Sequence, residues 1–240
     1  MVCAVPDTPT KALTQQFNLE DSSPFTREEL TYIALVTKDY TVGSHDYDEL
    51  MEAQVAINTT LQERSSIITS GMPHLDAGEG TSAAPDYDAM FHLTHERYAL
   101  DAEAISHLDD VYAVIHVVKM LYVLVIAAAF ACCFMSYKRD KAGLAMALKY
   151  AAISVMAFFG VMGVWACIDF NGMFNVFHSL FFTQGTWTFS WQSLLISMYP
   201  PAFWMGMGVI WFITTLTCCT LCLIIGKLLK KHSMRHTDAC

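Results

Sequence analysis

Three long apolar stretches limit the possible fold of this chain more than any other feature of its sequence. They run from about residue 111 to 137, from about 144 to 168 and from about 202 to 226. A helix needs roughly 20 mostly apolar residues to cross a bilayer, and each stretch is long enough. Of all 240 residues, 54% are hydrophobic and only 15% are charged, a balance typical of membrane proteins. We therefore expect an all-α integral membrane protein whose spans form a helical bundle.

Charge is distributed unevenly along the chain, and this predicts its orientation in the membrane. Residues 1–110 carry 20 acidic and five basic side chains, a net charge of −15, whereas residues 111–240 carry a net charge of +6. Lys and Arg next to span ends mark the cytoplasmic side. The turn YKRDKAG after the first span and the tail 227–240 are basic, so we expect both to be cytoplasmic. The acidic region and the loop 169–201, which contains no Lys or Arg, are then extracytoplasmic.

The predicted orientation raises the question of how the acidic region reaches the outside. The first residues, MVCAVPDTPTKALTQQFNL, have no apolar core and cannot act as a signal peptide. An acidic region as long as 1–110 rarely crosses a membrane without an upstream signal. We therefore expect a further span upstream of Met1, which would give four spans with both ends inside.

Outside the spans, the sequence predicts short helices and a flexible loop. Ser23 or Thr26 can cap a helix that begins in the residues after them, because their hydroxyls accept hydrogen bonds from backbone N–H groups. Residues 47–64 are compatible with a second short helix. Residues 65–90 are rich in Gly, Ser, Ala and Pro, which predicts a flexible outer loop. From about Thr94, a polar helix is predicted to run into the first span without interruption.

The loop between the second and third spans, 169–201, is aromatic and almost uncharged. Within it, residues 174–182 (FNVFHSLFF) place four phenylalanines on one face of a helix, and His178 lies inside that face. Tryptophans in the same loop suit the headgroup zone of a bilayer. We expect this helix to lie at or dip into the outer membrane interface. Gln184 and Gly185 should then turn the chain, and a double proline should lead into the third span.

Two histidines are predicted to meet at the outer membrane surface. His107 lies at the start of the first span, and His178 lies just past the end of the second. Glu103 and Asp110 are within one helical turn of His107, and Asp169 is near the start of the outer loop. A partly buried imidazole beside a carboxylate suits general acid/base catalysis near neutral pH. For each histidine, the alternative is a hydrogen-bonded interfacial residue with no catalytic role.

A metal centre is another alternative for the outer face. His92 and His95, in HLTHE, have the i, i+3 spacing of two ligands on one helix and could join His107, but the string lacks the HExxH order. Six of the eight cysteines lie in or at the ends of the spans, where cysteine behaves as a small hydrophobe. We therefore predict no metal and no cofactor. Nucleic acid is not expected as a partner, because the acidic region 1–110 would repel its phosphates.

Several motifs resemble those of a known family. They are EAISHLDDV at 103–111, FHSLFFTQGTW at 177–187 and LLISMYPPAFW at 194–204. They resemble a family of small bacterial integral membrane proteins that includes the lipoprotein intramolecular transacylase, and the likeness extends over about 25–64 and 90–226. The resemblance implies four transmembrane helices in the bacterial cell membrane, with an extracytoplasmic domain between the first two.

The resemblance also implies an activity, which is acyl transfer within one lipoprotein. The sn-2 ester acyl chain of the diacylglyceryl-cysteine would pass to the α-amino group of that cysteine, leaving a lyso-form lipoprotein. His107 and His178 would be the catalytic pair, with Asn175 and Trp187 as hydrogen-bond donors. The partners would be the diacylglyceryl-lipoprotein substrate and membrane lipid. The alternative function is a non-enzymatic membrane module whose outer domain binds a partner or assists assembly.

Overall fold

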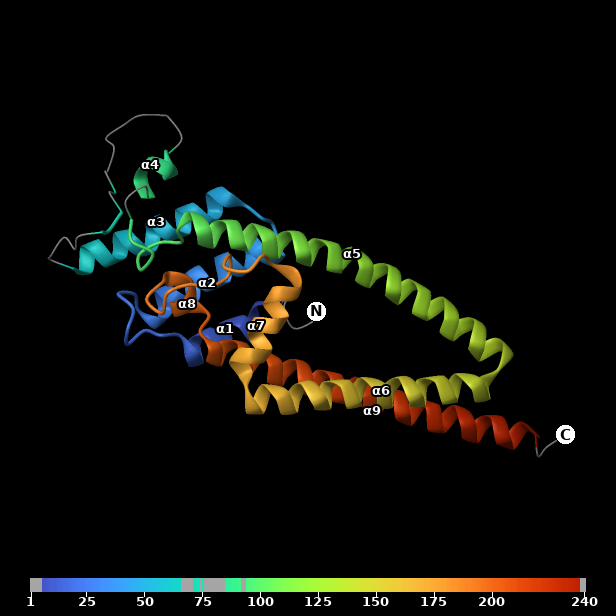
Figure 1. Cartoon of the computed structure of the whole chain (residues 1–240). Coiled ribbons are helices and arrows are strands. Elements are labelled where there is room, and N and C mark those ends of the chain that lie inside the picture. Colours follow the sequence, from blue (N-terminus) through green and yellow to red (C-terminus); the bar gives the residue numbers. More distant parts are fainter. Residues whose placement is uncertain (1–5, 66–70, 74, 76–84, 92–93, 238–240) are drawn as a thin grey trace. The chain divides into compact units, whose positions relative to one another are not determined.

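The chain folds into α-helices, as seen in a computed structural model that describes residues 6–65, 71–73, 75, 85–91 and 94–237. Every regular element in this described part is helical (Figure 1), which confirms the predicted all-α fold class. In chain order, the helices are α1 (Asp7–Phe17), α2 (Arg27–Val42), α3 (Tyr47–Arg64), α4 (Tyr87–Phe91), α5 (Ala102–Arg139), α6 (Lys141–Ile168), α7 (Phe170–Phe181), α8 (Leu194–Met198) and α9 (Pro201–Thr237).

Three of these helices, α5, α6 and α9, are long and apolar enough to cross a membrane. Each contains one of the predicted spans, so the prediction of three membrane helices is confirmed. In α5, the apolar stretch that can cross the bilayer lies after Leu108, because none of its residues is buried, whereas Ala104, His107 and Leu108 are. The first turns of α5 therefore precede the membrane-spanning segment.

The described helices belong to two compact units. The first unit comprises Met1–His116 and His178–Met207. The second unit comprises Val117–Phe177 and Gly208–Cys240. Both predicted histidines fall in the first unit.

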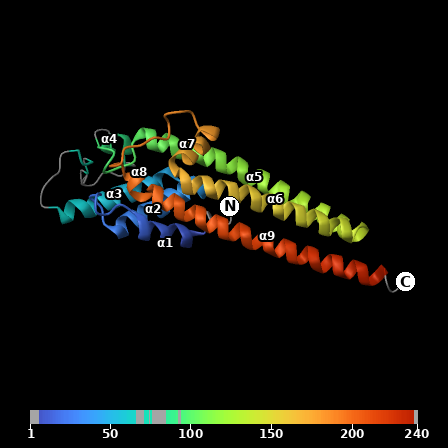
Figure 2. The ribbon, with the colours of Figure 1, turned by 60° about the horizontal axis from the view of Figure 1, so that its bottom comes forward.

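In the second unit, α6 and α9 pack side by side (Figure 2). A side-chain carbon added at Gly226 would lie 3.1 Å from the Ala145 carbonyl oxygen, and one added at Gly163 would lie 3.8 Å from the Phe212 ring. Because the later residue of α6 meets the earlier residue of α9, the two helices are antiparallel. The absence of a side chain at Gly226 allows their backbones to approach closely.

In the first unit, α2 is central and packs against α1, α3 and α8. Leu30, Ile33 and Ala34 repeat at helical spacing on its buried face and are completely enclosed. The Tyr199 hydroxyl, just after α8, donates a hydrogen bond to the Ala34 carbonyl oxygen. The apolar core is completed by side chains from other helices, among them Leu50, Met51, Ile57, Leu108, Leu194 and Met198.

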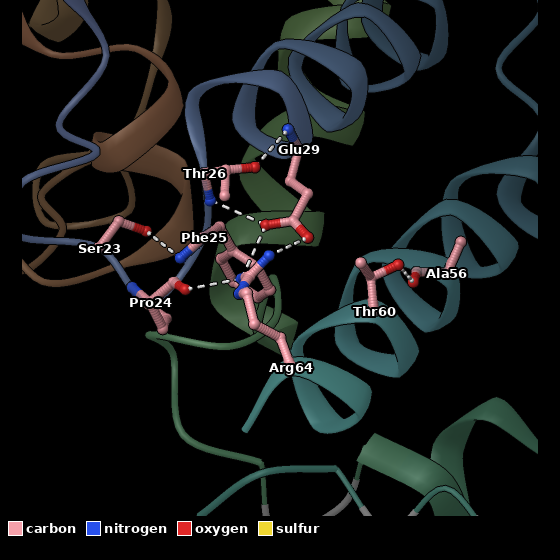
Figure 3. Close-up of polar contacts among 8 residues, drawn as sticks. All are labelled: Ser23, Pro24, Phe25, Thr26, Glu29, Ala56, Thr60 and Arg64. Atoms are coloured by element: carbon pink, nitrogen blue, oxygen red, sulfur yellow. Dashed lines mark hydrogen bonds and ion pairs between the residues drawn. The ribbon is translucent and has the colours of Figure 1, made fainter. Parts of the chain in front are cut away.

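A capping box starts α2 and also engages the end of α3 (Figure 3). The Glu29 backbone N–H donates to the Thr26 hydroxyl at 3.3 Å, and the Thr26 backbone N–H donates to the Glu29 carboxylate at 2.8 Å. The same carboxylate pairs with the Arg64 guanidinium at 2.9 Å. Of the two predicted cap residues, Ser23 and Thr26, it is therefore Thr26 that caps the helix.

The predicted start of the helix before the first span is wrong. Residues 96–98 form a turn, and α5 begins only at Ala102 rather than near Thr94. The Asp101 carboxylate accepts a hydrogen bond from the Ala104 backbone N–H at 2.8 Å, which caps the helix at this point. Polar helix-forming sequence upstream was therefore overridden by turn and cap hydrogen bonds.

Two further parts of the outer region are helix α1, which the sequence did not predict, and the predicted flexible loop. Helix α1 was not predicted, because its sequence is polar and its buried face includes the small polar residues Thr10 and Thr14. Packing against α2 stabilises it instead of an apolar stripe. Most of the predicted flexible loop, 65–90, lies outside the described residues.

Two buried amide side chains of α3 hold the segment that leads into α5. Gln54 and Asn58 are completely enclosed. The Gln54 Oε1 atom accepts a hydrogen bond from the Leu100 backbone N–H at 2.7 Å, and Asn58 Nδ2 donates to the Tyr98 carbonyl oxygen at 2.9 Å. An enclosed backbone group without a partner is costly. These bonds therefore determine where α5 begins, and with it the position of His107.

Replacing Gln54 with leucine should destabilise the protein by about 1–3 kcal/mol, because the enclosed N–H of Leu100 loses its acceptor. Thr60→Ala is the matched control in the same helix, since Thr60 is exposed and its hydroxyl donates to the Ala56 carbonyl within α3 (Figure 3). Thermal or denaturant unfolding of the purified protein measures the difference. Equal midpoints for the two variants would contradict this role for Gln54.

Candidate active site

The two predicted histidines lie next to each other in the first unit. His107 is in the second turn of α5, and His178 is in the last turn of α7. Their ring centroids are 6.4 Å apart, and the ring planes are inclined by 32°. At this distance, both imidazoles can contact one ester or amine group at the same time.

A backbone hydrogen bond and a turn position the segments around the histidine pair. The Leu194 backbone N–H donates to the Glu96 carbonyl oxygen at 2.8 Å, which ties the start of α8 to the turn before α5. Residues 184–187 form the turn that was predicted after α7. Gly185 in this turn has a φ of +97°, a conformation that glycine adopts readily because it has no Cβ. The turn directs the chain towards the aromatic residues that flank His107.

Aromatic rings surround the histidine pair. Phe182 contacts both histidines, with its ring centroid 4.9 Å from that of His107 and 5.8 Å from that of His178. Phe189 lies 5.6 Å from His107, and Trp187 lies 5.0 Å from His178. The sequence predicted the apolar face that contains Phe182. It did not predict the contact of Phe189, because no helical or strand spacing relates Phe189 to His107.

Burial among these rings changes the acid–base behaviour of His107, which lies before the membrane-spanning part of α5. Only 8% of the residue is exposed. The pKa of His107 is lowered from 6.5 to about 4, first by burial and then by repulsion from His178, while the Asp110 carboxylate opposes the shift. At neutral pH, His107 is therefore an uncharged imidazole.

Two polar atoms of the site are enclosed without a hydrogen-bond partner among the described residues. They are Nδ1 of His107 and Nε1 of Trp187. Buried polar atoms in proteins are nearly always paired, and exceptions occur where a ligand or a catalytic role accounts for them.

The predicted carboxylates of α5 differ in their relation to His107. Asp110 acts on the His107 ring electrostatically, as its effect on the pKa shows. Glu103 is exposed in the first turn of the helix and is not among the groups that shift the pKa of His107. Asp110 is thus the carboxylate of this pair that influences the site.

Asp169 and Asn175, the other predicted supporting residues, belong to the second unit. The Asp169 carboxylate accepts a hydrogen bond from the Gly172 backbone N–H at 2.8 Å, so it caps the start of α7. Roles for Asp169 and Asn175 beside the histidines stay predictions.

A second histidine cluster lies on another face of α5, and no sequence motif pointed to it. His45, in the loop between α2 and α3, stacks between the Tyr40 ring at 4.3 Å and the Tyr112 ring at 3.8 Å. Its Nδ1 lies 3.0 Å from the Tyr40 carbonyl oxygen, and its Nε2 lies 3.7 Å from the Asp109 carboxylate. The Tyr40 hydroxyl donates to the same carboxylate at 2.5 Å. The cluster holds α5 against α2 and so helps to position His107.

Within the described part of the chain, no group of three or more His, Cys, Asp or Glu side chains is arranged to hold a metal ion. Of the alternative ligands considered from the sequence, His92 lies outside the described residues. The Nδ1 atom of His95 accepts a hydrogen bond from the Arg97 backbone N–H at 3.2 Å.

Comparison with known proteins bears directly on this site. The family model described as "Lipoprotein intramolecular transacylase Lit" matches residues 81–204, just over half of the chain. The matched segment includes His107, His178 and the aromatic residues around them. No curated protein and no solved structure matches the chain.

The low pKa of His107 predicts how stability depends on pH. Between 6.5 and about 4, the unfolded chain gains a proton that the folded His107 does not accept, so stability should fall as the pH falls through this window. His107→Gln removes the group, so this variant should lose less stability on going from about pH 7 to about pH 4. Thermal unfolding in detergent across this range tests the difference. Parallel pH profiles for both proteins would contradict the lowered pKa.

Proposed function

This chain belongs to the lipoprotein intramolecular transacylase family and is therefore an acyltransferase, and we propose that it transfers an acyl chain within one diacylglyceryl-lipoprotein. The sn-2 ester acyl chain of the diacylglyceryl-cysteine passes to the α-amino group of the same cysteine, and a lyso-form lipoprotein remains. Converting an ester into an amide is downhill, so the reaction requires no cofactor. Membership of this family disfavours the alternative of a non-enzymatic membrane module.

The observation that carries the proposed mechanism is the 6.4 Å separation of the His107 and His178 rings within one unit. An acyl transfer needs a base for the amine and a donor for the oxyanion beside the same carbonyl group. Two adjacent imidazoles can supply both. Their aromatic surroundings suit an ester that carries long acyl chains.

We assign the role of base to His178. The protonated form of a free α-amino group has a pKa of about 8, so the neutral amine is available near neutral pH. The neutral amine must then lose one of its own protons as it attacks. While the amine nitrogen bonds to the ester carbonyl carbon, His178 accepts this proton. The tetrahedral intermediate then breaks its bond to the sn-2 oxygen, and His178 returns the proton to that oxygen. The amine thus loses one proton and the glyceryl hydroxyl gains it, so His178 ends the reaction unchanged.

We assign His107 to the oxyanion of the tetrahedral intermediate. Because burial keeps its ring uncharged, His107 can donate an N–H hydrogen bond as a neutral imidazole. Donors that are already oriented in a water-poor site stabilise developing negative charge most effectively. Trp187, whose ring lies 5.0 Å from that of His178, carries the N–H that we assign as a second donor for this charge.

Orientation supplies much of the remaining rate enhancement. The amine and the ester belong to one cysteine residue, so their reaction is intramolecular and avoids the entropy cost of bringing two molecules together. The site therefore has to hold one conformation of the substrate headgroup and move one proton. A small set of side chains, dominated by two imidazoles, is sufficient for this task.

Exposed apolar residues near the site support its location at the membrane interface. Leu180, in the last turns of α7, is 73% exposed, and Trp191 is 67% exposed. Large apolar side chains on a surface are typical of contact with lipid or with another protein. In this setting, the acyl chains of the substrate remain in the bilayer while its ester and amine reach the histidines.

The charge bias of the sequence supports the orientation of the protein in the bacterial cell membrane. The acidic region 1–110 and the loop 169–201 are extracytoplasmic in this proposal, and the C-terminal tail 227–240 is cytoplasmic. The histidine pair then faces the side of the membrane on which lipoproteins are displayed.

Substitution of the two histidines tests the assigned roles. His178→Gln should lower the rate of acyl transfer by about 100-fold or more, because glutamine cannot accept the proton. His107→Leu removes the oxyanion donor and should cost about 100- to 1,000-fold, whereas His107→Gln keeps an N–H donor and should retain more activity. His116→Gln, elsewhere in α5, is the control and should act as the wild type. Mass spectrometry of a reporter lipoprotein in a host without other N-acylating enzymes measures the product. Full activity of both His178→Gln and His107→Leu would exclude the mechanism.

Labelling of introduced cysteines tests the orientation. In a background whose native cysteines are replaced by alanine, Thr59→Cys, at an exposed position of α3, should react on intact cells with a maleimide that cannot cross membranes. Lys231→Cys near the end of α9 should react only after the cells are permeabilised. Labelling with the opposite pattern would contradict the extracytoplasmic position of residues 1–110.

A further inference from the structure

The Phe182 ring contacts both histidines, and it has no role in the proposed proton transfer or in oxyanion binding. The centroids of His107, His178 and Phe182 form a compact triangle with sides of 6.4, 4.9 and 5.8 Å. The other two flanking rings each pack on one histidine, Phe189 on His107 and Trp187 on His178.

The backbone of Phe182 is hydrogen-bonded to His178, and its ring packs against the ring of His107. The Phe182 N–H donates to the His178 carbonyl oxygen at 2.8 Å, so the two residues are fixed at the end of α7. The ring of Phe182 meets the His107 ring, which belongs to α5, in an edge-to-face arrangement at 71°. The Phe182 ring thus connects the end of α7 to the His107 ring on α5.

The Phe182 ring packs against the His107 ring, which is buried. His107 is 8% exposed although it lies near the start of a helix whose following turns are exposed. Water next to the ring would stabilise a charged imidazolium and would compete with the oxyanion for its N–H. A hydrophobic neighbour prevents both effects.

We propose that Phe182 is a positioning residue that sets the separation of the two imidazoles and keeps water away from His107. Its role as a positioning residue rests on the proposed transacylase function. Phe182 touches neither the transferred atoms nor the proton, and it acts through both histidines.

Titration of His107 tests the shielding directly and without any catalytic readout. The full-length His178→Gln protein is the background, so that repulsion from His178 is absent and only Asp110, on α5 itself, remains as a described charge acting on His107. Adding Phe182→Ala should raise the pKa of His107 by about one unit or more, because water gains access to the ring. Adding Leu180→Ala, a 73% exposed residue of α7, should leave this pKa unchanged. The measurement is the NMR shift of isotope-labelled histidine against pH, assigned with His107→Gln.

Rates of acyl transfer test the positioning in the protein with both histidines. Phe182→Ala should lower kcat by about 10- to 100-fold, because small misplacements of catalytic groups are costly, and should change KM much less. Its activity should fall more steeply towards acidic pH than that of the wild type. Phe182→Leu keeps an apolar side chain without a ring. Its His107 pKa and its kcat should lie between those of the protein with Phe182 and those of Phe182→Ala. It provides a second variant if the alanine substitution impairs folding.

The outcomes separate this inference from the proposed function. An unchanged pKa of His107 in both the alanine and leucine variants overturns the shielding, and a raised pKa with an unchanged kcat overturns the positioning role. Absence of acyl transfer by the wild-type protein would overturn the proposed function instead. The titration would then still decide whether Phe182 shields His107.

Discussion

Burial of the His107 imidazole beside a second imidazole is the constraint on which the proposed active site depends. A charged ring is unfavourable in an apolar environment and next to another ring that can be charged. His107 therefore stays neutral, with a pKa lowered to about 4. His107 is buried, whereas His178 is half-buried, so two chemically identical side chains lie in different environments. In the proposed mechanism, His107 donates a hydrogen bond to the oxyanion and His178 moves the proton.

The rest of the first unit holds this arrangement in place. Gln54 binds the backbone that leads into α5, and the His45 cluster holds another face of the same helix through Asp109. Neither contact touches the histidine pair. Each uses a buried or partly buried polar group whose loss would leave an unpaired partner, which makes the position of α5 costly to change. A site with few polar side chains depends on such supports, because its own contacts are mostly between rings.

Local sequence signals predicted which helices form better than they predicted the residues at which those helices begin. The three spans were predictable because apolar length is set by bilayer thickness, and the cap at Thr26 was predictable because a hydroxyl followed by glutamates is a local pattern. The start of α5 was placed too early, because the turn at 96–98 accepts hydrogen bonds from distant residues, Asn58 and Leu194. Helix α1 was missed for a related reason, since its stability comes from packing on α2.

The sequence by itself determined that the chain is an all-α membrane protein and that His107 and His178 lie within its family motifs. Both could be read from the sequence because apolar length and residue identity are local properties. The tertiary structure alone decided which side chains surround those histidines. Phe182 contacts both rings, and Phe189 reaches His107 from a segment beyond α7. The environment of an imidazole depends on every group packed against it in space. No pattern of neighbouring letters records that packing, so the neutral state of His107 became visible only in the folded protein.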